Sequence, residues 1–209
     1  MDLSIILFFQ LAILLMSIVI HEFAHGWMAF RLGDVTAKHH GRLTLNPIKH
    51  LDIWGSLVVP FMIFVFSGGN AIFGWAKPVP FNPNNLRDQK YGIAKVAAAG
   101  PFANLFIALI FGLILRFSTS GLFITSGMAQ IFSLIVFLNI LLAVFNLVPI
   151  PPLDGSKILF TFLPNSLENV RLFLEQYGMF VLLFFIFFLF QWILPIINII
   201  YWLFTGSFF

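Results

Sequence analysis

Apolar stretches long enough to cross a lipid bilayer are the feature that most restricts the fold of this chain. A membrane-spanning helix needs about 20 mainly apolar residues, and the sequence supplies such stretches at 3–30, 93–117 and 127–148. A fourth covers residues 177–191 and begins in the preceding stretch 168–176, whereas the residues after Pro195 predict a half-helix packed at the membrane interface. Because only 9% of the 209 residues are charged, against roughly 25% in soluble domains, we expect a surface solvated by lipid.

The stretch 53–66 is apolar but short, and it contains Gly55 and Pro60. Such a stretch is better suited to a re-entrant or interfacial segment than to a full span. Eight of the eleven Lys and Arg residues lie between positions 31 and 95. A fifth span here would divide these charges between two faces of the membrane, whereas a re-entrant segment leaves all eight in the cytosol, as positive charge prefers. We therefore predict an all-α polytopic membrane protein with four full spans and an external N-terminus.

The first apolar stretch carries the sequence H-E-F-A-H, which places His21, Glu22 and His25 within five residues. Histidines at positions i and i+4 share a helical face, so both imidazoles can reach one ion, with the glutamate beside them as a base. The alternative interpretation is two histidines satisfied by neighbouring helices. We favour a metal, because ionisable groups this close together in an apolar helix are costly without a partner. The chain has no Cys, so only His and carboxylate ligands are available.

Asp154 is the acidic residue best placed to complete such a site. It follows the third apolar stretch directly, in the sequence N-L-V-P-I-P-P-L-D-G at 146–155, whose prolines stiffen a non-helical turn. With four spans, this turn lies on the same side of the membrane as His21; with five it would lie on the opposite side. The alternative is a solvated aspartate that caps the next helix.

Together, these motifs resemble those of the site-2 protease family of intramembrane metalloproteases. H-E-F-A-H and the 146–155 sequence match its two signature motifs, and G-P-F-A-N at 100–104 resembles its G-P-x-x-N element. The segments G-R-L-T-L-N-P at 41–47 and G-W-A-K-P-V-P at 74–80 resemble loops of its compact prokaryotic branch. The resemblance covers roughly residues 12–160. It departs from many family members in leaving no room for a PDZ or CBS domain, so residues 1–209 are expected to form a single membrane-embedded metalloprotease domain.

The resemblance implies one zinc ion held by His21, His25 and Asp154, with Glu22 as the catalytic base. It also implies cleavage of single-span membrane proteins, in or near their transmembrane segments, from the cytosolic side of a prokaryotic cell membrane. Asn104 is a tentative substrate-binding or oxyanion residue, with an interhelical hydrogen bond as the alternative. The basic residues are accounted for by topology, so no nucleic-acid partner is expected.

A helical substrate must unwind before it can be cut, because its backbone groups are internally bonded. Short β-compatible pieces within 36–45 and 71–81 predict strands on the cytosolic side, one of which could pair with the substrate. The loop histidines His39, His40 and His50 have no suitably spaced carboxylate, and we expect them in a solvated or headgroup-facing loop. Two other functions stay open, namely a metal-ion transporter and a non-catalytic relative that binds membrane helices.

Overall fold

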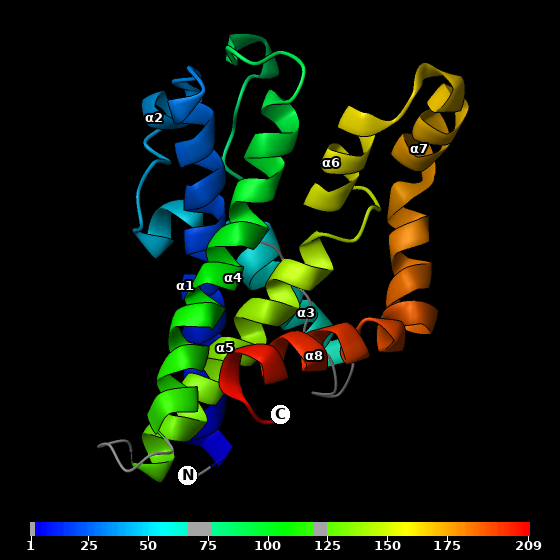
Figure 1. The fold of residues 1–209 in the computed structure, drawn as a ribbon. Helices are drawn as coiled ribbons and strands as arrows, with labels where there is room; N and C mark the ends of the chain where they lie inside the picture. The colour runs from blue at the N-terminus through cyan, green and yellow to red at the C-terminus, as the bar shows by residue number, and fades with distance from the viewer. Residues whose placement is uncertain (1–2, 67–76, 119–124) are drawn as a thin grey trace.

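The computed structural model describes residues 3–66, 77–118 and 125–209, and these residues fold into helices, turns and loops (Figure 1). Four helical segments are long and apolar enough to cross a membrane: Ile5–Arg31, Gly92–Ser118, Ser126–Asn146 and Asn165–Trp192. The all-helical architecture of the described residues is thereby confirmed, and the number of helices able to span a membrane equals the number of spans predicted. The stretch 53–66 is not among the four.

The long helices are α1 (Leu3–Arg31), α4 (Gly92–Ser118), α5 (Ser126–Asn146) and α7 (Glu168–Phe184). Shorter helices are α2 (Thr36–His39), α3 (Val59–Phe66), α6 (Asp154–Phe162) and α8 (Leu194–Thr205). Helical turns of other types are η1 (Pro47–His50), η2 (Ile53–Val58), η3 (Pro83–Asn85), η4 (Asn165–Leu167), η5 (Phe185–Leu189) and η6 (Phe190–Trp192).

The centre of the molecule is the packing of α4 between α1 and α5, which are its main partners. α8 has Pro195 in its first turn. Backbone N–H groups in the first turn have no partner within the helix, so the missing N–H of proline is tolerated there. It runs across α4 and α5 (Figure 1). A buried apolar cluster joins these three helices through Ala108, Ile140 and Ile197, which are fully buried. A second, smaller cluster contains Ala29, Leu86 and Val96, and joins α1, the loop before α4, and α4.

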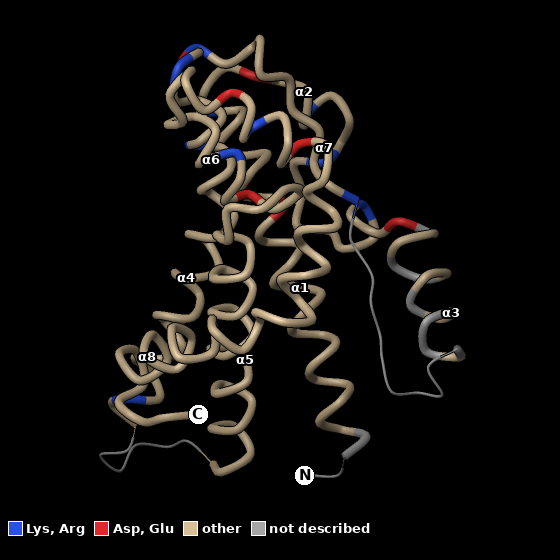
Figure 2. The backbone as a smooth tube through the Cα atoms, turned by 90° about the vertical axis from the view of Figure 1, so that its right-hand side faces the viewer, with Lys and Arg blue, Asp and Glu red and all other residues tan. Residues whose placement is uncertain are grey.

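Charged residues gather at one end of the molecule. In Figure 2, the Lys, Arg, Asp and Glu segments lie mostly at the end that carries α2 and α6. The chain passes this end after α1, before α4 and between α5 and α6, so the H-E-x-x-H sequence and Asp154 share it. Arg116 lies at the opposite end of α4, where its Nη1 donates a hydrogen bond to the carbonyl oxygen of Leu203 in α8.

No strand occurs among the described residues, so the short strands expected within 36–45 and 71–81 are not confirmed. Thr36 begins the helical turn α2 instead, because Oδ1 of Asp34 accepts hydrogen bonds from both its backbone N–H and its hydroxyl group. Residues 77–82 are not helical, but Pro78 and Pro80 have no N–H for a strand ladder. Residues 71–76 lie outside the described part of the chain.

Candidate metal centre

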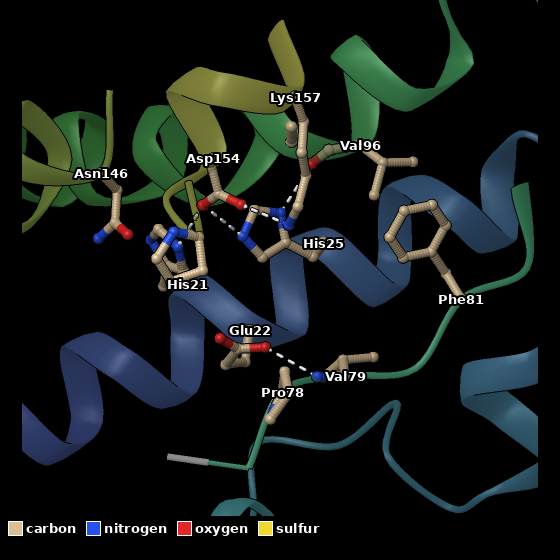
Figure 3. A pocket seen from close by; sticks show the side chains of 12 residues that line it. His21, Glu22, His25, Pro78, Val79, Phe81, Val96, Asn146, Asp154 and Lys157 are labelled. Carbon is tan, nitrogen blue, oxygen red and sulfur yellow. Dashed lines mark hydrogen bonds and ion pairs between the residues drawn. The ribbon is translucent and has the colours of Figure 1, made fainter. Parts of the chain in front are cut away.

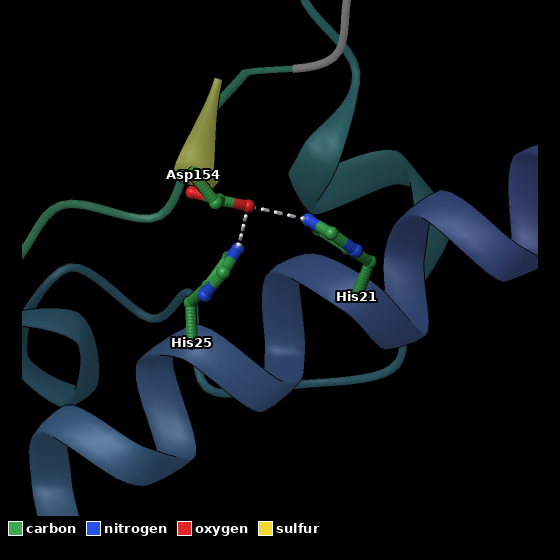
Figure 4. Close-up of side chains that lie close together, drawn as sticks. All are labelled: His21, His25 and Asp154. Atoms are coloured by element: carbon green, nitrogen blue, oxygen red, sulfur yellow. Dashed lines mark hydrogen bonds and ion pairs between the residues drawn. The ribbon is translucent and has the colours of Figure 1, made fainter. Parts of the chain in front are cut away.

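Three side chains able to bind a metal ion meet where α1 passes the start of α6 (Figure 4). His21 and His25 project from one face of α1, one helical turn apart. The Nε2 atom of each ring lies 3.0 Å from Oδ2 of Asp154. The three residues are buried, and they form the one group in the described chain whose potential ligand atoms all lie within 4.8 Å of one another. The fold therefore brings together the three residues expected as ligands.

A tight turn between α5 and α6 holds the Asp154 carboxylate in this position. Within the turn, the N–H of Leu153 donates to the carbonyl oxygen of Ile150 at 2.9 Å. The backbone then folds back on itself so closely that a Cβ atom on Gly155 would lie 2.2 Å from the carbonyl oxygen of Leu147. Glycine at position 155 is thus required by the close approach, and Asp154 begins α6 directly before it.

The far sides of the two rings contact hydrogen-bond acceptors. Nδ1 of His25 donates to the backbone carbonyl of Val96 at 2.7 Å, and Nδ1 of His21 lies 2.6 Å from Oδ1 of Asn104. A neutral imidazole that donates from Nδ1 has a lone pair on Nε2. Two such lone pairs then face one carboxylate oxygen, with no hydrogen between these electron-rich atoms. A cation at this point satisfies all three groups, so the donor set fits a metal ion.

Gly100 leaves space beside the two ligand nitrogens. A Cβ atom built on Gly100 would lie 2.6 Å from Nε2 of His21 and 2.6 Å from Nε2 of His25. Any larger residue at position 100 would therefore occupy the space next to both rings. The G-P-x-x-N resemblance thus has a steric basis, because its glycine lies beside the metal centre.

A pocket of about 160 Å³ opens onto the three residues (Figure 3). Glu22 lines it from α1, and its Oε2 accepts a hydrogen bond of 2.8 Å from the backbone N–H of Val79. Pro78 and Phe81 line the pocket from the same non-helical segment, and Asn146 lines it from the end of α5. The segment 77–82 therefore forms one wall of the pocket and holds the carboxylate of Glu22.

Lys157 supplies positive charge beside Asp154. Burial by itself raises the pKa of the Asp154 carboxyl group, whereas the positive charge of Lys157 lowers it. The ammonium group of Lys157 donates to Oδ1 at 3.0 Å, one helical turn further along α6. Oδ1 is therefore engaged by Lys157, and Oδ2 faces the histidines. Sequence reasoning missed Lys157, although its spacing of three residues from Asp154 was a usable signal.

Asn104 lies behind His21 rather than among the residues that line the pocket. Its side chain is fully buried, and its Nδ2 donates to the carbonyl oxygen of Ser17 in α1 and to Oδ1 of Asn139 in α5. These contacts match the interhelical alternative for Asn104 rather than direct binding of substrate. Asn139 was missed by sequence reasoning, although a polar side chain within an apolar span is itself a signal of function or packing.

The three loop histidines lie apart from this centre and differ among themselves. His39 and His40 are exposed, as expected of a solvated loop. His50, however, is 1% exposed, and its Nε2 lies 2.8 Å from the carbonyl oxygen of Thr44. His50 thus stabilises the loop after α2 rather than facing solvent.

Comparison with known proteins identifies a family and several relatives of this chain. Residues 118–189 match the family described as "Peptidase family M50". "Putative zinc metalloprotease YwhC" of Bacillus subtilis is 37% identical over 194 residues, which cover 90% of this chain and 82% of that protein. "Putative zinc metalloprotease Rip2" of Mycolicibacterium smegmatis is 32% identical over 200 residues, which cover 92% of this chain and 71% of that protein. No solved structure matches the chain.

Proposed function

We propose that this chain, which belongs to peptidase family M50 and is an intramembrane zinc metalloprotease of the site-2 type, holds its zinc ion with His21, His25 and Asp154 and uses Glu22 as its catalytic base. The observation that supports this assignment most strongly is the convergence of two Nε2 atoms on one carboxylate oxygen, each at 3.0 Å. Three protein ligands are the number found in catalytic zinc sites, which leave one position for water or substrate.

Zinc in such a site lowers the pKa of its bound water to about 7 and polarises the substrate carbonyl. Glu22 accepts the proton of the attacking water and passes it to the leaving amine. The N–H of Val79 engages Oε2 of Glu22, so we assign the proton transfer to Oε1. Lys157 keeps Oδ1 of Asp154 engaged, which leaves Oδ2 as the ligand atom.

The substrates that we propose are single-span membrane proteins, cut in or near the transmembrane segment. A segment that has locally unwound offers free N–H and C=O groups, which an extended backbone can pair. Pro78, Val79 and Phe81 line the pocket, and the segment 77–82 to which they belong is not helical. We place the substrate along this segment and assign the backbone N–H of Phe81 to substrate pairing. The N–H groups of Val79 and Asn82 on either side already donate to Glu22 and Asp34.

The membrane topology that we propose has four spans, an external N-terminus and the metal centre toward the cytosol of a prokaryotic cell. The gathering of Lys and Arg at the end with α2 and α6 (Figure 2) supports this orientation. η2 and α3 together form a short apolar element in which α3 contacts mainly η2. We assign it as the re-entrant segment, and α8 as the interfacial half-helix.

Comparison of the wild type with Glu22→Gln tests this function. Both proteins, purified in detergent, are assayed for zinc and for cleavage of a single-span test substrate. We expect about one zinc ion per chain in each, with cleavage by the wild type alone, because Gln cannot accept the proton. Cleavage by Glu22→Gln at the wild-type rate would show that another group is the base.

A further inference from the structure

Two amide side chains are fully buried between the spans, where a polar group without partners is costly. Asn104 of α4 and Asn139 of α5 are both 0% exposed, and Ser17 of α1 is 4% exposed. Together they form a chain of hydrogen bonds through three helices that ends at His21. The mechanism above uses none of these three residues.

The direction of this chain is set at its far end by the backbone. Nδ2 of Asn139 lies 2.9 Å from the carbonyl oxygen of Ile135, a group that can only accept. The same Nδ2 donates to Oγ of Ser17 at 2.9 Å. Since both N–H groups of Asn139 are directed to these two oxygens, its Oδ1 faces Asn104 and must accept.

The second amide is oriented in turn. Nδ2 of Asn104 donates to Oδ1 of Asn139 at 2.8 Å and to the backbone carbonyl of Ser17 at 3.2 Å. Its Oδ1 therefore points toward His21, where it can only accept a hydrogen bond. Nδ1 of His21, at 2.6 Å, must then carry the proton, which places the lone pair on Nε2, the atom that faces Asp154.

We propose that Asn139 and Ser17 are positioning residues which, through Asn104, fix the tautomer of His21 so that its Nε2 is free to bind the metal. The inference rests on the proposed metal site. The tautomer of His25 is fixed without such residues, because its Nδ1 contacts the backbone carbonyl of Val96. A carbonyl can only accept a hydrogen bond, so Nδ1 of His25 carries the proton. An amide can turn over, and a reversed Asn104 would donate to Nδ1 and drive the proton onto Nε2, where it would block metal binding.

Asn139→Leu is the variant that tests the proposal, and the zinc dissociation constant of the purified protein is its first readout. Without Asn139, Asn104 is held only by the longer contact with Ser17. We expect zinc affinity to fall about 10- to 100-fold, the usual effect of losing a residue that orients a metal ligand. Ser133→Ala is the matched control: it removes a hydrogen bond of the same helix, to the Tyr201 hydroxyl, and should leave zinc affinity unchanged.

Two substitutions of Asn104 show whether this residue orients the ring of His21 or only packs the helices together. Asn104→Asp keeps an acceptor for the Nδ1 proton of His21 but loses both donated hydrogen bonds, whereas Asn104→Leu loses all three. We expect zinc affinity within about tenfold of the wild type for Asp and a larger loss for Leu. Equal losses in the two variants would assign Asn104 to packing alone and overturn the proposal.

The tautomer itself is measured in metal-free protein with ¹⁵N-labelled histidine rings, at a pH where the rings are neutral. The His21 signals are identified by their absence in His21→Gln. We expect a proton on Nδ1 in the wild type and a mixture of tautomers in Asn139→Leu. If wild-type zinc binding is tight but Asn139→Leu changes neither affinity nor tautomer, this inference falls and the proposed function stands. If the wild type binds no zinc, the proposed metal site falls, and the inference that rests on it falls with it.

Discussion

Gly100 of α4 faces Nε2 of His21 so closely that a Cβ atom would lie 2.6 Å from that nitrogen. The same hypothetical atom would lie equally close to Nε2 of His25. The lack of a side chain at this position is therefore part of the metal centre, since it provides room beside the ligand nitrogens.

Gly100→Ala should consequently weaken zinc binding by at least about tenfold, because the methyl group displaces the rings or the ion from ligand distance. Zinc titration of the purified variant measures this. Gly127→Ala is the matched control, since a Cβ there meets nothing within 4 Å. Equal affinity in both variants would show that the rings can move aside without loss of the site.

Phe81 provides a test of the substrate's position. Phe81→Pro removes the backbone N–H that we assign to substrate pairing, so cleavage should fall at least about tenfold while zinc content stays the same. Phe81→Leu keeps this N–H and an apolar side chain, and it should cut within a few-fold of the wild type. Wild-type cleavage by Phe81→Pro would rule out pairing at this residue.

Asp34 lies outside the spans and fastens the loop before α4 to the end of α1. Its carboxylate accepts hydrogen bonds from Thr36, Asn82 and Asn85. Burial by itself raises the pKa of this carboxyl group, but these hydrogen bonds outweigh it and lower the pKa. A lowered pKa contributes stability that is fully present above the unfolded-state pKa of about 4 and is lost as pH falls through the folded-state value.

Asp34→Asn should therefore lower the free energy of unfolding at neutral pH by about 1–3 kcal/mol. The difference from the wild type should shrink as the pH falls below about 4. Unfolding in detergent, followed across this pH range, measures both effects. Glu168→Gln serves as a control, because Glu168 is exposed and should contribute little at any pH. A difference for Asp34→Asn that does not vary with pH would contradict the role of the charge.

Local spacing was sufficient to predict the parts of the site that belong to one helix. His21 and His25 share a face because of the helical period, and Asp154 followed from counting spans, since the number of crossings fixes the side on which each turn lies. Long-range contacts gave no such signal. The hydrogen bond from Val79 to Glu22 and the one between Asn104 and Asn139 join segments distant in sequence, so neither could be read from periodicity.

The strands expected on the cytosolic side are not confirmed among the described residues, and at Thr36 a local contact favours a helical turn over an extended segment. β-compatible composition around Thr36 predicted an extended segment, but the carboxylate of Asp34 turns the chain into α2. His50 was expected in a solvated or headgroup-facing loop because no carboxylate is suitably spaced for a metal site. It is buried instead, and its ring contacts the carbonyl oxygen of Thr44, a contact that spacing in the sequence does not indicate.

The assignment of the metal ligands is tested by the zinc content of four purified proteins: wild type, His21→Gln, Asp154→Asn and His40→Gln. His40 is an exposed histidine away from the site and controls for nonspecific binding. We expect about one zinc per chain in the wild type and in His40→Gln, and a much reduced zinc content in His21→Gln and Asp154→Asn. Full zinc content in His21→Gln and Asp154→Asn would contradict the assignment of these residues as ligands.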